Sequence, residues 1–346
     1  MSVPPNACTL RPSGKDFHLD KPARSQGHFT SMKTTIRLFT RLLLFLSVSL
    51  AAPNARAVVP PPDGGYAGFN TAEGQNSLFN LTTGSANTAV GWLSLRTLTG
   101  GSFNTGVGAG TLALNIADNN TAIGAGALLS NATGYQNTAN GAFALFGNTT
   151  GFQNTATGTN ALFNNTAGSG NVANGIKALF SNTTGGINTA IGYQALFSNT
   201  TGVSNTATGV NVLFNNTNGS SNTASGDGAL FYNTEGSVNT ANGVQALNSN
   251  TTGNANTANG YQALFHNITG INNTAIGSYA LGNNTSGIVN VALGSGAGSG
   301  VTTANGVISI GINGANVSDS CYIGNIWNQP GGSQAVYVNS EGKLGA

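Results

Sequence analysis

Apolar and polar positions repeat along this chain with a period of 17 residues. The block that begins Asn-Thr-Ala-Ile-Gly at Asn188 recurs from Asn70 onward, and successive blocks start 17 residues apart, except for 16 residues between Asn104 and Asn120. So strict a period indicates stacked copies of one small unit. The 14 blocks begin at Asn70, Asn87, Asn104, Asn120, Asn137, Asn154, Asn171, Asn188, Asn205, Asn222, Asn239, Asn256, Asn273 and Asn290.

Three columns of residues recur at fixed places in the block. Counted from the first Asn, position 5 is Gly in all 14 copies, position 9 is Leu in 13, and position 10 is most often Phe, while positions 3 and 8 are small. We expect these columns to form the structural repeat and its interface. Their central members are Gly141, Gly158, Gly175, Gly192 and Gly209; Leu145, Leu162, Leu179, Leu196 and Leu213; and Phe146, Phe163, Phe180, Phe197 and Phe214.

The block is too rich in glycine and turn residues for a helix of useful length. Two short strands joined by two turns fit instead, with glycine at the corners where a positive φ is needed. Each block is then one coil of an all-β parallel β-solenoid. About 14 coils, stacked at ~4.8 Å, give a rod on the order of 65 Å long.

Stacking places identical side chains above one another. Because positions 9 and 10 are adjacent on an expected strand, Leu should face the interior and Phe the outside. A row of exposed phenylalanines usually marks an interface, so we expect self-association, most simply a homotrimer around the Phe row. The asparagines at positions 1 and 12 should form amide ladders from coil to coil.

The region before the repeats has the pattern of an export signal. Residues 1–31 show no hydrophobic period, and we interpret them as a non-native extension with the true start at Met32. Residues 32–57 combine a basic start, an apolar run from Leu42 to Ala52 and a small-x-small site that ends at Ala57, as in a signal peptide. The Pro- and Gly-rich residues 58–69 are typical of a short linker.

At this point the repeats resemble a known family. The motif Asn-Thr-Ala-Ile-Gly-x-x-Ala, at 188–195 and 273–280, is similar to the head repeats of YadA-like trimeric autotransporter adhesins. That resemblance implies a left-handed parallel β-roll that assembles as a trimer over residues 70–311, with 307–311 as a last coil. The 17-residue period is longer than that family's usual coil. We see no heptad stalk or membrane-anchoring barrel, so we expect no transmembrane anchor in this chain.

The tail, 312–346, is similar to the segment that precedes S74-type intramolecular chaperone domains in fibre proteins. We interpret it as a C-terminal β cap, with a strand over 335–339. A stack of coils needs such a cap because unpaired strand edges aggregate. The mature chain keeps one cysteine, Cys321, which we expect to be buried because its neighbours are apolar.

Composition limits the chemistry that this chain can perform. Charged residues make up 6% of it, and its net charge of +2 comes mostly from the N-terminus. Nucleic acid is therefore not an expected partner. Neither His266 nor any pair of carboxylates has the spacing of an acid–base site, and the acidic nonapeptide of calcium-binding rolls is absent from the sequence. We expect no enzyme, cofactor or metal site.

These observations favour an exported, non-enzymatic and adhesin-like fibre segment, located outside the cell or at a bacterial cell surface. It would meet a host, surface or polysaccharide ligand through a repetitive, neutral polar face. The alternative is an ice-binding or glycan-binding solenoid that uses the ranks of Thr at positions 2, 13 and 14.

Overall fold

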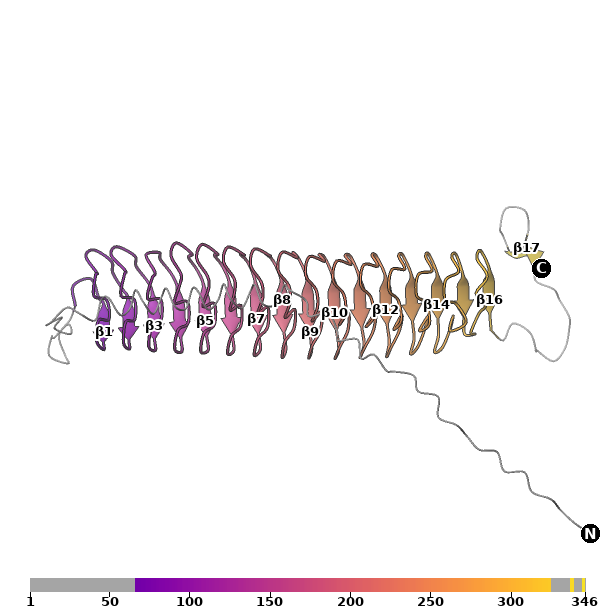
Figure 1. Ribbon diagram of the computed structural model, residues 1–346, viewed down its shortest axis with the longest axis horizontal. Helices are drawn as coiled ribbons and strands as arrows, with labels where there is room; N and C mark the ends of the chain where they lie inside the picture. Colours follow the sequence, from indigo (N-terminus) through magenta and orange to yellow (C-terminus); the bar gives the residue numbers. More distant parts are fainter. Residues whose placement is uncertain (1–65, 325–336, 339–343, 346) are drawn as a thin grey trace, which may run out of the picture. The chain divides into compact units, whose positions relative to one another are not determined.

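The computed structural model describes residues 66–324 and the strand residues 337–338 and 344–345. Residues 66–324 form a β-solenoid in which 16 strands make one parallel sheet in sequence order (Figure 1). The described residues contain no helix. The predicted all-β solenoid is thus confirmed. The expected N-terminal extension, the signal peptide and residues 58–65 of the linker lie outside the described residues, as do 325–336, 339–343 and 346 of the tail.

Each coil contributes one strand of three residues to this sheet. The strands are β1 Thr71–Glu73, β2 Thr88–Val90, β3 Thr105–Val107, β4 Thr121–Ile123, β5 Thr138–Asn140, β6 Thr155–Thr157, β7 Val172–Asn174, β8 Thr189–Ile191, β9 Thr206–Thr208, β10 Thr223–Ser225, β11 Thr240–Asn242, β12 Thr257–Asn259, β13 Thr274–Ile276, β14 Val291–Leu293, β15 Ile308–Ile310 and β16 Cys321–Ile323.

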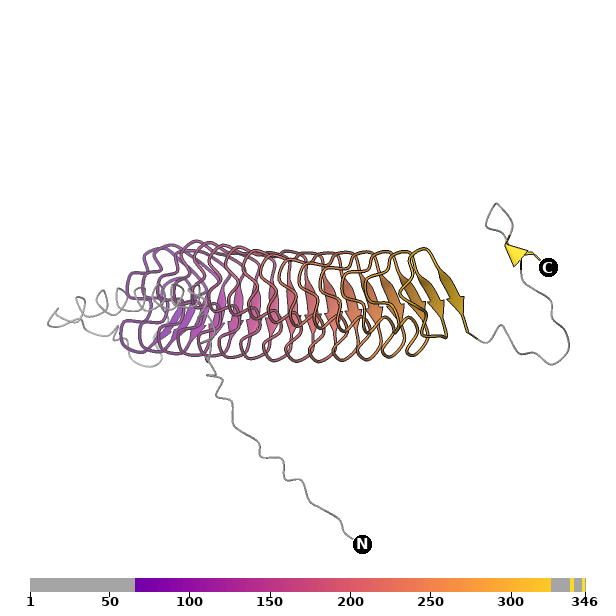
Figure 2. The ribbon, with the colours of Figure 1, turned by 45° about the vertical axis from the view of Figure 1, so that its right-hand side comes forward.

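The strands pair in the register that the sequence period predicts. Thr189 lies opposite Thr206, and the short block is accommodated because Thr105 still lies opposite Thr121. The residue missing from that coil therefore falls in a turn and leaves the sheet undisturbed. Figure 2 shows the strand arrows side by side along the solenoid.

The stack continues past the predicted boundary at residue 311. Strand β15 occupies the expected last coil, but Ile308 then pairs with Cys321, so a further coil of 13 residues follows. Beyond it, β17 (Tyr337–Val338) falls within the strand predicted over 335–339 and pairs antiparallel with β18 (Leu344–Gly345). The capping role of this pair stays a prediction.

The prediction of two strands per coil is wrong. The strand covers positions 2–4, and the segment that carries Leu and Phe is a series of turns. The 13 leucines at position 9 adopt φ between 45° and 52°, in the left-handed region. Backbone bonds still join this side of neighbouring coils: the Leu196 N–H donates to the Val212 carbonyl at 2.9 Å, and the Ser198 N–H to that of Phe214 at 3.0 Å.

The glycine at position 5 turns the chain out of the strand. Its φ lies between 113° and 146° in every block, a region that other residues rarely adopt. The adjacent coil also leaves no room for a side chain: a Cβ on Gly141 would lie 2.6 Å from the Gly158 carbonyl oxygen. The predicted corner role of the column from Gly141 to Gly209 agrees with this geometry.

Leucine, alanine and asparagine fill the interior. The leucines from Leu145 to Leu213 are fully buried, together with alanines at positions 3 and 8. Asn188 is also fully buried; its Nδ2 donates to Asn171 Oδ1, and its Oδ1 accepts from Asn205 Nδ2 at 3.1 Å. A second ladder runs at position 12, where Asn199 Nδ2 donates to Asn182 Oδ1 at 2.8 Å. Both predicted amide ladders are therefore confirmed.

The strand argument predicted that the Phe column is exposed to water, and the structure shows that it is not. Because the Leu–Phe segment is not extended, its side chains do not alternate between two faces. Phe146 is buried, and Phe163, Phe180, Phe197 and Phe214 are half-buried. From Phe146 to Phe231 each ring stacks on the next, with centroids 5.0–5.3 Å apart and ring planes within 9°. The stack shields its own ring faces within one chain.

Candidate functional site

One regular surface of the solenoid is the outer face of the 16-stranded sheet, which we call the sheet face. It consists of positions 2 and 4 of every coil, whose side chains point outward while the Ala at position 3 points in. Neighbouring strands lie ~4.8 Å apart, and positions 2 and 4 lie ~7 Å apart along a strand. The sheet face is thus a two-dimensional array with one pair of side chains per coil.

Threonine dominates position 2, and its hydroxyl is available for binding. Thr206, Thr223 and Thr240 are exposed, and no position-2 threonine hydroxyl bonds to another described residue. The threonines at position 13 differ, because their hydroxyls are used within the fold: Thr183 donates to the Thr200 carbonyl at 3.0 Å, and Thr200 in turn to that of Thr217. Free hydroxyls therefore lie on the sheet face and also at position 14, where Thr150 and Thr184 are exposed and their hydroxyls bond to no other described residue.

Position 4 divides the sheet face into three zones. Near the N-terminal end it holds Val90, Val107 and Ile123, each between 37% and 43% exposed. From β5 to β12 it is polar, with Asn, Thr or Ser at every strand except β8. From β13 to β16 it is aliphatic again, with Ile276, Leu293, Ile310 and Ile323. The sheet face therefore offers a neutral polar centre between two apolar ends.

A second side of the coil, positions 6–11, carries the Phe stack. The stack ends at Phe231, because the next coil has Asn248 at position 10; Phe265 follows alone, and then Gly282. A hollow of about 270 Å³ borders Asn248, and another of about 300 Å³ borders Gly282. The sequence carried a signal for both, since they coincide with departures from Phe at position 10.

The described part of the chain has few titratable groups. No three His, Cys, Asp or Glu side chains gather there as metal ligands do. Burial, and to a smaller degree the Glu73 carboxylate, raise the pKa of the Tyr66 phenol. A hydrogen bond with Tyr261, then desolvation, raise the pKa of the Tyr279 phenol. Both shifts favour the protonated form of the phenol.

Cys321 is exposed, so the prediction that it is buried is wrong. It occupies position 2 of the last strand, opposite Ile308, and that position faces outward throughout the sheet. The inward residue of this strand is Tyr322, which packs against the core. Of the apolar neighbours of Cys321, Ile323 therefore belongs to the exposed aliphatic zone of the sheet face, whereas Tyr322 points inward.

Comparison with known proteins does not place this chain in a family. No family model, curated protein or solved structure matches the chain. In residues 66–324 and the two short strands beyond them, no helical segment has the length and hydrophobicity that crossing a membrane requires.

Proposed function

We propose that the mature chain is a non-enzymatic, adhesin-like rod that works outside the cell and binds an extended partner through its sheet face. The observation that carries this proposal is the array of free, in-register Thr hydroxyls on β1–β6 and β8–β13, which only Val172 of β7 interrupts. A periodic ligand, such as a polysaccharide or a fibrous surface, would repeat each weak contact many times. Many weak contacts along one rod give avidity without a deep pocket.

The N-terminal signal segment and the resemblance to YadA-like heads support an extracellular, self-associating rod. In a homotrimer, the two aliphatic zones of the sheet face would supply apolar contact area, whereas the rings of the Phe stack already cover one another. Light scattering on the mature chain should give three times the mass of one chain. Mass spectrometry after export from a bacterial host should place the new N-terminus at Val58.

The binding role is tested on surfaces coated with chitin, cellulose, mannan or collagen. Thr206→Arg with Thr240→Arg places two bulky cations on the sheet face, two coils apart, and should weaken retention of the mature chain. Thr184→Arg with Asn218→Arg is the matched control, because both residues are exposed at position 14 and also lie two coils apart. Equal retention of both double variants, or no retention of the natural chain on any surface, would refute the proposal.

Ice binding is a second candidate for the same surface, and the flat array of hydroxyls favours it. Hydroxyls at fixed spacings on a rigid sheet can hold water in an ordered layer. The mature chain should then inhibit ice recrystallisation, and Thr206→Arg with Thr240→Arg should remove that effect. No inhibition at high protein concentration would exclude this candidate and leave the polymer-binding proposal standing.

A further inference from the structure

The hollow at Gly282 results from a gap in an otherwise continuous column of rings. Along the stack each Phe is covered by the ring of the next coil, as Phe180 is by Phe197 at 5.2 Å. Phe265 has no such neighbour, because position 10 is Asn248 in the preceding coil and Gly282 in the following one. The place that an aromatic ring occupies elsewhere is here left open beside a single phenyl ring.

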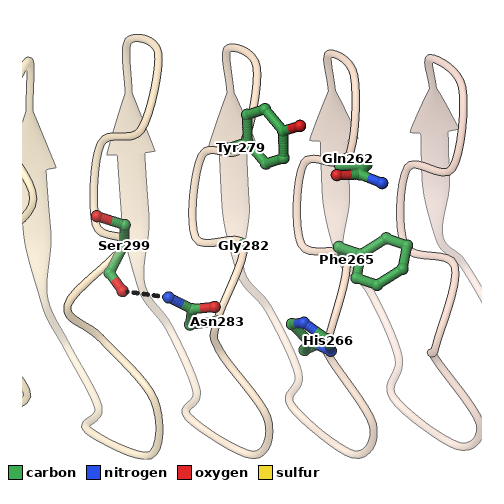
Figure 3. A pocket seen from close by; sticks show the side chains of 7 residues that line it. All are labelled: Gln262, Phe265, His266, Tyr279, Gly282, Asn283 and Ser299. Atoms are coloured by element: carbon green, nitrogen blue, oxygen red, sulfur yellow. Dashed lines mark hydrogen bonds between the residues drawn. The ribbon is translucent and has the colours of Figure 1, made fainter.

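Side chains from three coils surround this space (Figure 3). Gln262 and Tyr279 lie on one side of Gly282, and His266 and Asn283 on the other, with Phe265 between them. The volume of about 300 Å³ is at the lower limit for small-molecule pockets and suits a ligand with a single ring.

The lining combines aromatic surface with the hydrogen-bonding groups of Gln262, Asn283 and the His266 imidazole. Gln262 Nε2 donates to Gln245 Oε1 at 2.6 Å, which leaves Gln262 Oε1 as an acceptor. Asn283 Nδ2 donates to the Ser299 carbonyl at 2.9 Å, which leaves Asn283 Oδ1 and one N–H unused. Neither a carboxylate nor a Lys or Arg side chain is among the described residues around the hollow. The site therefore selects an uncharged ligand with both donors and acceptors.

Among small ligands, a sugar ring has this combination. A pyranose carries C–H groups on its faces, which pack on an aromatic ring, and hydroxyls around its rim that both donate and accept. We propose that the hollow at Gly282 binds one pyranose residue of a neutral glycan, with its apolar face on Phe265 and its hydroxyls toward Gln262 and Asn283. The site lies at positions 7–11 of the coil, away from the sheet face, and so goes beyond the function proposed above.

The experiment titrates the mature chain with methyl glycosides of glucose, galactose, mannose and N-acetylglucosamine, followed by saturation-transfer NMR and calorimetry. At least one glycoside should bind, with a Kd on the order of 1 mM, as expected for a single small ring. Gly282→Phe inserts the residue found at position 10 in eight blocks, fills the hollow and should weaken binding at least about tenfold. Phe265→Ala should do the same by removing the ring beneath the sugar.

Phe180→Ala is the matched control, since it removes a ring of the same column that does not border the hollow. Its affinity should stay within about twofold of that of the natural chain, a difference of ~0.4 kcal/mol. Circular dichroism checks that all three variants keep the fold. The proposal is overturned if no glycoside binds, or if Gly282→Phe binds as tightly as the natural chain. Thr206→Arg with Thr240→Arg should leave glycoside binding unchanged. The proposal for this hollow and the proposal for the sheet face are therefore tested independently.

Discussion

The asparagine ladder at position 1 should be a main source of stability, and Asn188→Ala tests this directly. The Asn188 side chain is fully buried and makes four hydrogen bonds. Its Nδ2 donates to Asn171 Oδ1 at 3.2 Å and to the Gly202 carbonyl at 2.8 Å. Its Oδ1 accepts from the backbone N–H of Asn205 at 3.0 Å and from Asn205 Nδ2 at 3.1 Å.

Removal of the Asn188 side chain leaves some of its hydrogen-bond partners with another bond and one partner with none. The Gly202 carbonyl keeps the bond from Asn199 Nδ2, and Asn171 Oδ1 keeps the bond from the Asn188 backbone N–H. The Asn205 backbone N–H, however, is left buried without a partner. One unsatisfied buried group costs ~1–3 kcal/mol, and each other lost bond contributes ~0.5–1.5 kcal/mol. With three other bonds lost, we expect Asn188→Ala to lower the free energy of unfolding by about 3–7 kcal/mol.

Asn188→Leu separates lost hydrogen bonds from lost volume, because Leu has as many side-chain heavy atoms as Asn, is bulkier and leaves no cavity. A loss similar to that of the Ala variant assigns the effect to the bonds. Asn174→Ala is the control: this Asn is exposed at position 4 of the preceding coil, and a surface change of this kind alters stability by ~0.5 kcal/mol or less.

Guanidinium unfolding followed by circular dichroism gives the overall change. Because coils of a repeat array open locally, hydrogen exchange of peptides from residues 171–221 reports the effect where it arises. The reasoning is refuted if Asn188→Ala loses no more stability than Asn174→Ala, or if exchange quickens equally along the whole solenoid.

Three further outcomes follow from the geometry. Leu196→Ile should lower the stability of the solenoid by more than ~2 kcal/mol in a thermal melt, because a β-branched residue resists the left-handed φ of 52°. Leu196→Met, the control, should lower it by less than ~1.5 kcal/mol. Equal losses of stability would contradict this reasoning. Gly192→Ala should prevent folding of its coil, because the new Cβ would overlap the Gly209 carbonyl. Gly100→Ala should be tolerated in the same melt, because its Cβ meets only the Thr83 hydroxyl, at 3.3 Å. Similar melting points for the two variants would refute the steric argument. Cys321 should react with a maleimide in the native mature chain as fast as in denaturant, and protection would show that it is covered.

The sequence predicted the features that depend on repetition alone. In-register pairing, burial of Leu145 and its equivalents, and the amide ladders all follow once identical residues are stacked at one spacing. Even the 16-residue block could be placed, because its Asn, Gly and Leu keep their order. These features need no knowledge of how the chain bends between its corners.

The features that the sequence did not predict depend on backbone dihedral angles. Leucine gives no sign that it will adopt a positive φ, so Leu145 and Phe146 were assigned to a strand. A weak sign of the left-handed backbone is present at position 7, two residues before the Leu in each block. Two blocks have Gly126 and Asn160 there, and both residue types tolerate the left-handed region. Cys321 was misplaced for a different reason: its apolar neighbours outweighed its alignment with the outward-facing position 2.

The candidate sites were partly visible in the sequence. The rank of Thr at position 2 was recognised, but its flatness depends on one continuous sheet, which the structure shows. The hollow beside Phe265 required knowledge that the rings stack. Only then does Gly282 become a gap rather than a neutral variation.

The 17-residue separation of nearly every Asn–Asn bond in the ladders bears on how the protein is made. Asn205 donates to Asn188 in the coil before it and to Gly219 in its own block, and Asn222 then donates to Asn205. The ladder bonds join only adjacent coils, so the entropy of closing long loops does not slow folding. A chain that leaves a ribosome or a secretion pore from its N-terminal end can therefore wind coil by coil onto what has already emerged. Each finished coil would also hinder the chain from sliding back.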